Sequence, residues 1–445
     1  MNYQALFARA GDRDVKVGLV GVGDFGTSLL ARSLKIPNLE ITVICDQDRS
    51  RMEAAASVTG MDAAQVVMTD NIMGGTTPDF DVLVEATGQP EAAAIVAEWA
   101  IGEKHHVVMA SKEAAIVCGP MLHELASRQG VVYTEIDGDQ PSLLIGLVSW
   151  AHTLGLDIVA AGKSSEYDFI LDGDELCWLE KSHPASGLKA LWHESGEGWP
   201  KLVANREQAA INAGFPTRTV PDFCEMGVVA NATGLEPDRA GFHAPLLRSV
   251  ELADVFQEID HGGIMASSGR VDVFNCFRRN DESSFAGGVF VVVSCDDEKT
   301  WELLRGKGHV VAKNGRAAML YNPQHLLGVE APISILSAGL LGLPTGASEP
   351  KPRFDLVARA GRDFKKGDVL EITDHHHHEV SGLSPELLPA AVLEDANPCP
   401  YYLATNKTLV EDVVEGSVIT AGMLELDNEN ALYRLRRMQD HHFLE

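Results

Sequence analysis

The segment GLVGVGDFGTSL, residues 18–29, places glycines at the spacing G-x-G-x-x-G between an apolar run and a helical stretch. Gly21 permits a tight turn, Gly23 lets another group approach the backbone, and Gly26 lets the helix pack closely against the strand. The N-terminus of such a helix presents unpaired N–H groups and a positive potential. The sequence therefore predicts a strand, a tight turn and a helix that together can hold an anion.

Apolar strand-like runs alternate with helical stretches through the first part of the chain, as is typical of a doubly wound parallel sheet. We expect its strands at residues 15–21, 39–46, 81–88, 106–110 and 131–137. The predicted fold class is α/β, with a Rossmann doubly wound parallel sheet in a dinucleotide-binding domain that spans residues 1–168.

Two further domains are expected after this one. Long polar loops around a few strong strands predict a mixed α+β domain at residues 169–329, suited to catalysis and dimerisation. An apolar helix at 330–342 is expected to return to the first domain. A linker rich in proline, glycine and serine follows it, and the short strands with turn signals at 350–445 predict a small β-rich domain.

Composition and charge limit the function classes. The 445 residues are 45% apolar and 22% charged, as in soluble globular proteins. We expect no membrane span and no signal peptide, because no apolar run is long enough and the first residues lack the charged-then-apolar order. Seven scattered cysteines indicate reduced thiols and a cytoplasmic location. The net charge of −28 argues against nucleic acid as a partner.

The context of the glycine turn predicts that its anion is a dinucleotide. Asp46 ends the second strand, 20 residues after Gly26, where a carboxylate would bind ribose hydroxyls. Asp46 favours NAD(H) because it would repel a 2′-phosphate, whereas Arg49 and Arg51 could neutralise one. Small residues in EATGQP, residues 85–90, would let the second ribose approach. The predicted cofactor-binding residues are Gly21, Gly23, Asp24, Phe25, Gly26, Asp46, Arg49, Thr87, Gly88 and Lys112.

Two lysines follow strand ends, where ligands bind in α/β sheets. Lys112 follows the strand at 106–110, and Lys163 ends a later strand that continues into Ser164 and Ser165. A lysine there can polarise a carbonyl, hold a phosphate or relay a proton. Two hydroxyls beside an ammonium suit an anionic or polyhydroxylated substrate, although either serine could instead cap a helix.

The middle of the chain supplies weaker candidates. Asn231 is expected either to bind a substrate oxygen or to close a helix beside Gly234. Glu225, in an otherwise apolar helix, is either a paired core charge or a site acid. Arg316 is a candidate for binding a substrate phosphate or diol, and His325 is expected to be a packed histidine.

Three carboxylates at alternate positions, Glu135, Asp137 and Asp139, end the strand at 131–137. Alternate residues of an extended chain share a face, where these charges repel one another. We expect Glu135 and Asp137 at the substrate and take Asp137 and Asp139 as candidate metal ligands. Gly138 can end the strand and turn Asp139 toward the following helix as its cap. We interpret the run His375–His378 as a polar loop, because adjacent histidines rarely converge on one ion.

Several of these segments resemble one family. GLVGVGDFG, EATG, VVMASKEA and EIDGDQP are similar to the cofactor domain of homoserine dehydrogenase-like oxidoreductases, in which a lysine follows the fifth strand. The C-terminal pattern LVARAGRDFKKGDVLEI followed by YYLATNKTLVEDVVEGSVITAGML resembles a SAF domain. The combination is similar to the bacterial 1-deoxy-D-xylulose 5-phosphate reductoisomerase-like enzymes, although the usual reductoisomerase signature GSTGSIG is absent.

The resemblance implies a specific reaction, the reductive isomerisation of 1-deoxy-D-xylulose 5-phosphate to 2-C-methyl-D-erythritol 4-phosphate in isoprenoid precursor synthesis. It implies NADP(H) in preference to NAD(H), a divalent Mg²⁺ or Mn²⁺ ion, a phosphorylated sugar substrate and a homo-oligomer. Lys112, Lys163, Asp137 and Glu135 would be catalytic, and Ser164, Ser165, Asn231 and Arg316 would bind substrate. One alternative is simple hydride transfer on a hydroxy-acid or sugar-acid substrate, and another is a non-catalytic protein that binds nucleotide and carbohydrate.

Overall fold

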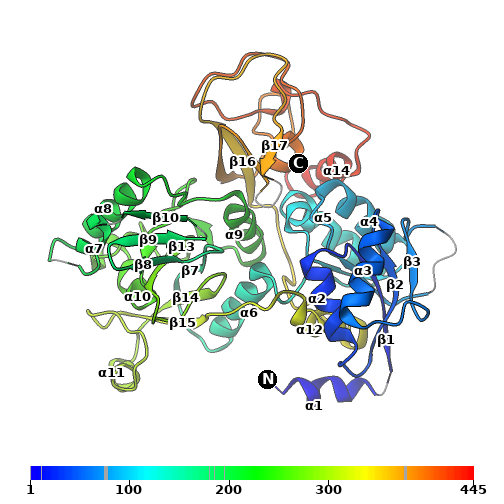
Figure 1. Ribbon diagram of the computed structural model, residues 1–445, viewed down its shortest axis with the longest axis horizontal. Helices are drawn as coiled ribbons and strands as arrows, with labels where there is room; N and C mark the ends of the chain where they lie inside the picture. The colour runs from blue at the N-terminus through cyan, green and yellow to red at the C-terminus, as the bar shows by residue number, and fades with distance from the viewer. Residues whose placement is uncertain are drawn as a thin grey trace.

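The computed structural model describes residues 2–445 except 12, 75–78, 180, 185, 195 and 375–377. His375, His376 and His377 of the histidine run therefore lie outside the described residues. Figure 1 shows two large bodies, a blue N-terminal one and a green middle one, with the orange and red C-terminal part above the seam between them.

The first body is built on a six-stranded parallel sheet in the order β3-β2-β1-β4-β5-β6. The order reverses at β1 and β4, which confirms the doubly wound fold and creates a crevice at the carboxyl ends of these strands. The strands are β1 (Val15–Val20), β2 (Leu39–Cys45), β3 (Val67–Thr69), β4 (Val82–Glu85), β5 (His106–Met109) and β6 (Tyr133–Glu135). The helices are α2 (Asp24–Ser33), α3 (Arg49–Thr59), α4 (Pro90–Gly102) and α5 (Lys112–Gln129).

A second, mixed sheet forms the middle body, in the order β10-β9-β8-β13-β7-β14-β15, with β11 and β12 also paired to β13. Its strands are β7 (Ile158–Ser164), β8 (Phe169–Asp172), β9 (Glu175–Trp178), β10 (Lys181–Pro184), β11 (Glu236–Pro237), β12 (Leu246–Leu247), β13 (Arg270–Arg279), β14 (Val289–Ser294) and β15 (Ala317–Asn322). Because β7 pairs with β13 and β14, the expected boundary at residue 168 is corrected. The first sheet ends with β6, and β7 belongs to the second.

Helices join the two sheets. α6 (Gln140–Thr153) packs on β7 and β14 of the second sheet and on α9 (Val220–Thr233), which in turn packs on α5 of the first body. In Figure 1, α6 and α9 accordingly lie at the centre of the molecule. The remaining helices are α1 (Tyr3–Phe7), α7 (Ser186–Ala190), α8 (Trp199–Asn212), α10 (Leu252–Val255), α11 (Glu298–Gly306) and the 3₁₀ turns η1 (Ala8–Ala10), η2 (Ser249–Glu251), η3 (Ile259–His261), η4 (Leu327–Val329) and η6 (Ala421–Met423).

The chain then returns to the first body through α12 (Pro332–Leu336) and a π-helical turn, η5 (Ser337–Leu341). Ile335 and Leu336 lie in one apolar cluster with residues of β1, β2 and β4. A Cβ at Gly339 would stand 2.6 Å from the Val15 side chain, so glycine allows this close approach. The returning segment thereby completes one face of the N-terminal sheet.

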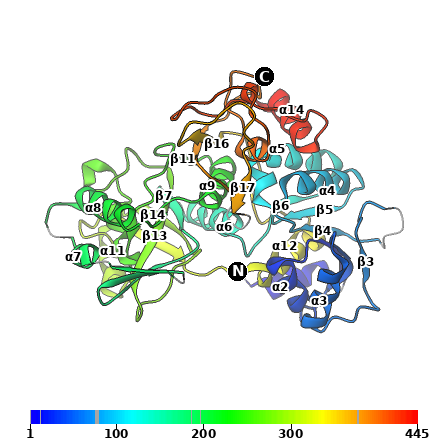
Figure 2. The ribbon, with the colours of Figure 1, turned by 45° about the horizontal axis from the view of Figure 1, so that its top comes forward.

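The C-terminal domain contains small antiparallel pairs: β16 (Phe354–Ala360) with β19 (Leu383–Pro389), and β17 (Ile372–Asp374) with β18 (Glu379–Val380). Its helices are α13 (Tyr401–Ala404) and α14 (Ala431–Phe443), and α14 packs on α4 and α5. Figure 2 shows α14 beside these two helices. The predicted small β-rich region is therefore present.

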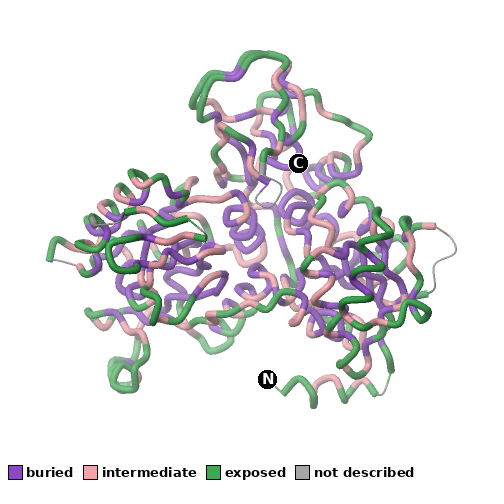
Figure 3. The backbone as a smooth tube through the Cα atoms, viewed as in Figure 1, coloured by how far each residue is buried: buried purple, intermediate pink, exposed green. Residues whose placement is uncertain are grey.

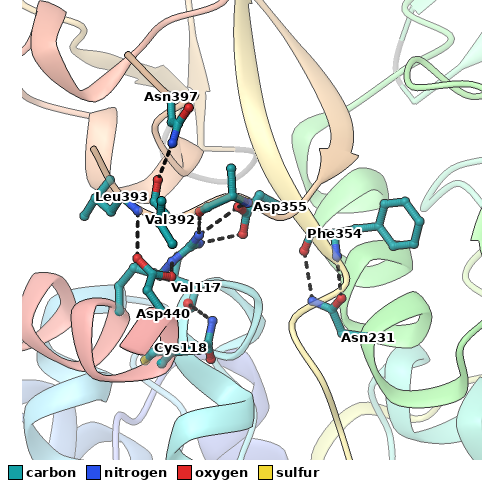
Figure 4. Close-up of polar contacts among 12 residues, drawn as sticks. Val117, Cys118, Asn231, Phe354, Asp355, Val392, Leu393, Asn397 and Asp440 are labelled. Atoms are coloured by element: carbon teal, nitrogen blue, oxygen red, sulfur yellow. Dashed lines mark hydrogen bonds and ion pairs between the residues drawn. The ribbon is translucent and has the colours of Figure 1, made fainter. Parts of the chain in front are cut away.

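Buried polar contacts hold this domain together and join it to the other two (Figure 4), the first body through Gln439, which donates to Val117 O of α5. Arg436 of α14 is fully buried and pairs with Asp355 and Asp440. Asn231, which we expected at the substrate, lies here instead. Its amide donates to Phe354 O at 3.0 Å, and its Oδ1 accepts the N–H groups of Arg353 and Phe354. It joins the end of α9 to the start of β16, and both its amide nitrogen and its amide oxygen bond there.

Burial follows this division of the chain. In Figure 3, purple buried segments fill the interiors of the two large bodies and of the seam where α5, α6 and α9 meet. Within the described part of the chain, no helix combines the length and the apolar character that crossing a bilayer requires.

Candidate active site

The glycine turn has the shape that a dinucleotide requires. A Cβ at Gly21 would stand 2.4 Å from Ala86 O, and one at Gly26 would stand 2.2 Å from Gly21 O. Both glycines therefore allow the backbone segments to pack in contact. A Cβ at Gly23, in contrast, would meet no described atom within 4 Å. The space over Gly23, at the N-terminus of α2, fits a pyrophosphate group.

A cavity of about 670 Å³ opens over this turn. Four of the predicted cofactor-binding residues, Gly21, Gly23, Asp46 and Thr87, line it. The Asp46 carboxylate accepts the Val22 N–H at 3.2 Å and the Asp48 N–H at 3.0 Å, which fixes it at the end of β2. These residues and the glycine cradle could hold NAD(P), whose nicotinamide supplies or accepts a hydride when it is bound.

Other predicted cofactor residues lie beside the cavity. Asp24, Phe25 and Gly26 form the first turn of α2, and the Gly88 N–H donates to Ser111 Oγ at 2.8 Å. Arg49 is not among the described lining residues, because its guanidinium pairs with Glu53 at 3.0 Å on the exposed face of α3. Arg51 does line the cavity, together with Asp48 and Asp70.

The last residue of β4, Glu85, is a buried acid beside this site that the sequence analysis did not single out. Its Oε1 accepts both the N–H and the hydroxyl of Thr87, at 2.9 and 2.5 Å. Its Oε2 makes no hydrogen bond within the described part of the chain. Burial raises the pKa of Glu85 to about 7, against the lowering effect of the Ser111 and Thr87 hydroxyls. The carboxyl group is therefore poised to titrate near neutral pH.

The two predicted lysines meet at one carboxylate. Lys112 Nζ donates to Glu225 Oε1, and Lys163 Nζ donates to Glu225 Oε2 and to Asp222 Oδ1, the latter at 2.8 Å. Lys112 Nζ also lies 3.8 Å from Asp139 Oδ1. Lys112 begins α5, Lys163 ends β7, and both acids project from the first two turns of α9. The sequence thus correctly selected both lysines as neighbours of one crevice, although their partners come from a third element.

Burial separates the roles of these charges. The Lys163 side chain is 1% exposed, whereas that of Lys112 is 22% exposed. Burial alone would lower the pKa of each ammonium, but Asp139 and Glu225 at Lys112, and Asp222 and Glu225 at Lys163, raise both above the usual value. Burial opposes ionisation of Glu225 too, yet the two lysines lower its pKa to about 2. Both lysines are therefore ammonium ions, and Lys112 is the one that solvent or a ligand can reach.

A small polar cavity of about 140 Å³ lies over this network. Lys112, Lys163, Asp139, Asp222 and Glu225 line it, together with Glu113, Gln140, Ser165, Glu166, Tyr167, Trp178, Thr219, Pro221, His325 and Leu327. Ser165 and Thr219 hydroxyls both donate to Asp222 Oδ2, at 2.8 and 2.9 Å. The cavity therefore combines a reachable ammonium with fixed carboxylates, an arrangement suited to proton transfer.

Ser164 and Ser165 were both predicted to bind substrate, but only one of the two side chains reaches the cavity. Ser165 lines the cavity, whereas Ser164 is fully buried and its Oγ makes no hydrogen bond within the described residues. Successive residues of a strand point to opposite faces, so only one of the two can reach the crevice. Arg316 is exposed just before β15 and is absent from the described lining of the cavity.

The three strand-end carboxylates also diverge. Glu135 is buried, and its Oε2 accepts the Ala347 N–H at 3.2 Å. Asp137 Oδ1 accepts the Ser142 hydroxyl at 2.5 Å, and neither Glu135 nor Asp137 is among the described lining of the cavity. Asp139 alone reaches it, as the residue that caps α6. The turn at Gly138, with φ +98°, separates these directions and corrects the expectation that Glu135 and Asp137 face the substrate.

The donor set does not fit the expected divalent ion. Asp137 and Asp139 are engaged with different partners, and among the described residues no three His, Cys, Asp or Glu side chains converge as a metal site. We therefore derive no step through a metal.

Sequence reasoning missed Asp222, Thr219 and Gln140, which line the small polar cavity over the lysine network. A signal for Asp222 was present in the sequence. Asp222 and Glu225 are three residues apart, so in a helix they share one face. Two acids on one face of an otherwise apolar helix indicate buried partners of opposite charge.

Two known families match separate parts of this chain, one in the first body and one in the middle body. Residues 18–135 match the family described as homoserine dehydrogenase, NAD binding domain, and residues 214–331 match the family described as oxidoreductase DRL, catalytic domain. The chain therefore carries the domains of an NAD(P)-dependent oxidoreductase. The second match includes Asp222, Glu225 and Thr219 of α9 and its N-cap. No curated protein matches the chain.

Solved structures of oxidoreductases resemble parts of the fold. An oxidoreductase from Agrobacterium radiobacter in complex with NAD⁺, L-tartaric acid and magnesium is 16% identical, with a TM-score of 0.29 over 35% of this chain and 46% of its own. GenD2 from gentamicin A biosynthesis, in complex with NAD, is 15% identical, with a TM-score of 0.38 over 75% of this chain and 88% of its own. Biliverdin reductase from Synechocystis sp. PCC 6803 is 18% identical, with a TM-score of 0.26 over 44% and 57%. The chain thus spans less than half the length of the first of these relatives.

Proposed function

We propose that this chain catalyses NAD(P)-dependent reduction of a carbonyl group, with Lys112 as the proton donor. The observation that carries the proposal is the Lys112–Glu225–Lys163 network at the end of the cofactor crevice. The Lys112 ammonium can stabilise and then protonate an oxygen that becomes an alkoxide when hydride is added. Glu225 holds Lys112 Nζ in place, and Lys163, which Asp222 holds, helps to keep Glu225 ionised inside the protein.

For the substrate we propose 1-deoxy-D-xylulose 5-phosphate, which would undergo reductive isomerisation to 2-C-methyl-D-erythritol 4-phosphate. The support is that residues 214–331, which supply Asp222 and Glu225, match the catalytic domain of oxidoreductase DRL. Ser165, Thr219 and Gln140 offer polar groups to a polyhydroxylated molecule. Lys112 would act on the carbonyl oxygen in the final reduction.

A second candidate substrate is an amino-aldehyde such as aspartate semialdehyde. The described lining of the small polar cavity contains five carboxylates, those of Glu113, Asp139, Glu166, Asp222 and Glu225, against two lysines. Excess negative charge favours a substrate with a cationic ammonium over one with a dianionic phosphate. The match of residues 18–135 to homoserine dehydrogenase supports the same candidate.

For the cofactor, the lining supports NAD(H), in place of the NADP(H) that the resemblance implies. The carboxylates of Asp46, Asp48 and Asp70 line the cavity, and Arg51 is the arginine among its described lining residues. Three carboxylates repel a 2′-phosphate, whereas a single arginine attracts it. Comparing the dissociation constants of NADH and NADPH by fluorescence titration decides between the two cofactors. Arg51→Ala should weaken the binding of NADPH and leave the binding of NADH unchanged.

The test of the reaction follows cofactor oxidation with each substrate, with and without Mg²⁺ or Mn²⁺. We expect Lys112→Met to lower kcat by roughly 100- to 10,000-fold, the usual contribution of a general acid, while dinucleotide binding is retained. Lys35→Met, at an exposed position just beyond the end of α2, should leave kcat unchanged. Turnover of aspartate semialdehyde but not of deoxyxylulose phosphate selects the second candidate. Full activity of Lys112→Met, or no dinucleotide binding by the wild type, overturns the proposal.

A further inference from the structure

A third cavity, of about 540 Å³, lies where the C-terminal domain meets the first body. One wall is formed by the start of α4, and the opposite wall by residues of β17 and of the turn that follows α13. Four residues, Gln47, Gln89, Ala92 and Ile95, line both this cavity and the cofactor cavity. The two spaces are therefore neighbours with a common border, and the C-terminal domain lies beside the place where a dinucleotide fits.

Among the described residues, the C-terminal domain contributes the ammonium of Lys407 to the third cavity. Its Nζ lies 3.2 Å from Glu91 Oε1 in the first turn of α4, and the two side chains are 20% and 48% exposed. An ion pair exposed to this extent contributes little to stability. Glu91 is the more exposed partner, so its side chain can leave the pair without burying an uncompensated charge.

The backbone that carries Lys407 is held rigidly. Asn406 adopts a left-handed conformation with φ +60°, and its Oδ1 accepts the Ile372 N–H at 3.2 Å. Lys407 O accepts the Leu370 N–H at 3.0 Å, and the Asn406 N–H donates to Leu370 O at 2.8 Å. The backbone of this turn therefore has a fixed position, while the flexible Lys407 side chain can change where its ammonium lies.

We propose that the C-terminal domain completes the dinucleotide site and that Lys407 binds a phosphate of the cofactor in exchange for Glu91. The inference rests on the proposed dinucleotide binding and adds a ligand from a domain outside the Rossmann fold. A phosphate is a stronger partner than an exposed carboxylate, because it offers several charged oxygens to the ammonium. Gln47 and Gln89 line both cavities, so their amide groups lie on the border between the two.

The experiment compares Lys407→Ala and Glu91→Gln for binding of NADH and NADPH by titration calorimetry on the full chain. If Lys407 binds phosphate, Lys407→Ala weakens binding about tenfold, the usual scale of one charge-assisted hydrogen bond. Glu91→Gln then retains or tightens binding, because it frees Lys407. If the pair only docks the domain, both variants act alike. Lys365→Ala, which removes an exposed cation paired with Asp412 on the same domain, is the matched control.

The two cofactors distinguish the phosphates. Equal weakening of NADH and NADPH by Lys407→Ala assigns Lys407 to the pyrophosphate, and weakening of NADPH alone assigns it to the 2′-phosphate. Unchanged binding of both, or identical losses in Lys407→Ala and Glu91→Gln, overturns the inference. If the wild type binds neither dinucleotide, the proposed function itself fails, and that outcome is seen before any variant is measured.

Discussion

At the scale of single residues, Glu225 and its two lysines show how strongly buried charges depend on one another. Lys163 is fully buried and has Asp222 and Glu225 as its partners. Removing an ammonium from such a group leaves carboxylates in a medium that solvates them poorly. The same contacts that tune Lys112 therefore also stabilise the fold.

We expect Lys163→Met to lower the free energy of unfolding by about 3–5 kcal/mol, the cost of breaking a buried ion pair on one side. Urea denaturation measures this loss. Adding Glu225→Gln and Asp222→Asn to the same chain should restore part of the stability, because neutral amides no longer need the cation. A triple variant less stable than the single one would contradict the ionic origin of the effect.

Glu85 predicts a pH dependence of stability. Its folded pKa, about 7, lies above the ordinary value of 4.5, so the folded chain keeps a proton that the unfolded chain releases. Its contribution is therefore fully present below pH 4.5 and is lost as the pH rises through about 7. The shift corresponds to roughly 3 kcal/mol.

Glu85→Gln, which mimics the protonated acid, should raise Tm relative to the wild type more at pH 8 than at pH 5. Thermal unfolding across this range measures the difference. Glu53→Gln on the exposed face of α3 serves as the control and should show no such trend. A constant difference between wild type and Glu85→Gln at all pH values would show that the carboxyl group does not titrate in this window.

Single residues also show where sequence reasoning stops. Lys112 and Lys163 were predicted because each lies at a strand end, but their strands, β5 and β7, belong to different sheets, and Glu225 of α9 brings the two lysines together. The cap role of Asp139 was foreseen, but Glu135 and Asp137 were expected in the same crevice, from which the left-handed turn at Gly138 separates them. A Cβ at Gly138 would stand 1.9 Å from Leu327 O, so a contact with a distant segment determines that turn. Such a contact leaves no local periodicity in the sequence.

At the scale of elements, the β1–α2 turn separates packing from binding. Gly26 is pressed against Gly21 O, while the space over Gly23 is open. We expect Gly26→Ala to destabilise the fold by about 1–3 kcal/mol through overpacking. Gly23→Ala should leave stability nearly unchanged but weaken dinucleotide binding by roughly tenfold or more, about 1.4 kcal/mol or above.

Unfolding and binding measurements on the same two variants separate these effects. Tight dinucleotide binding by Gly23→Ala would place the pyrophosphate elsewhere. The doubly wound sheet itself was predictable from strand-helix alternation and the glycine spacing. The membership of β7 in the second sheet was not, because a buried strand of small and apolar residues does not specify its neighbours.

At the scale of the whole molecule, α14 fixes the C-terminal domain to the first body. Arg436 bonds Asp355 at 2.8 Å and Asp440 at 2.6 Å, and Gln439 donates to Val117 O of α5 at 3.0 Å. These contacts hold α14 against β16 and α5. Asp355 and Val117 are far from α14 in the sequence, so local sequence patterns could not indicate that they contact it.

We expect Arg436→Met to lower the free energy of unfolding by about 3–5 kcal/mol, since two buried carboxylates lose their partner. Arg434, on the same helix α14, forms an exposed ion pair with Glu98 of α4. Arg434→Ala should lower the free energy of unfolding by less than about 1 kcal/mol. Denaturant unfolding followed by fluorescence measures both. Equal losses in the two variants would show that burial of the pair is not what matters.

The return of α12 to the N-terminal sheet has a consequence for synthesis of the chain. Asp137 N–H donates to the Ser334 hydroxyl, a hydrogen bond between residues 197 apart. A ribosome that adds 5–20 residues per second needs roughly 10–40 s to cover that interval. During this time the part of the nascent Rossmann sheet that α12 and η5 later cover is open on one apolar face. The first domain to emerge is therefore among the last to be finished, and a chaperone that shields apolar surface would act on it while translation continues.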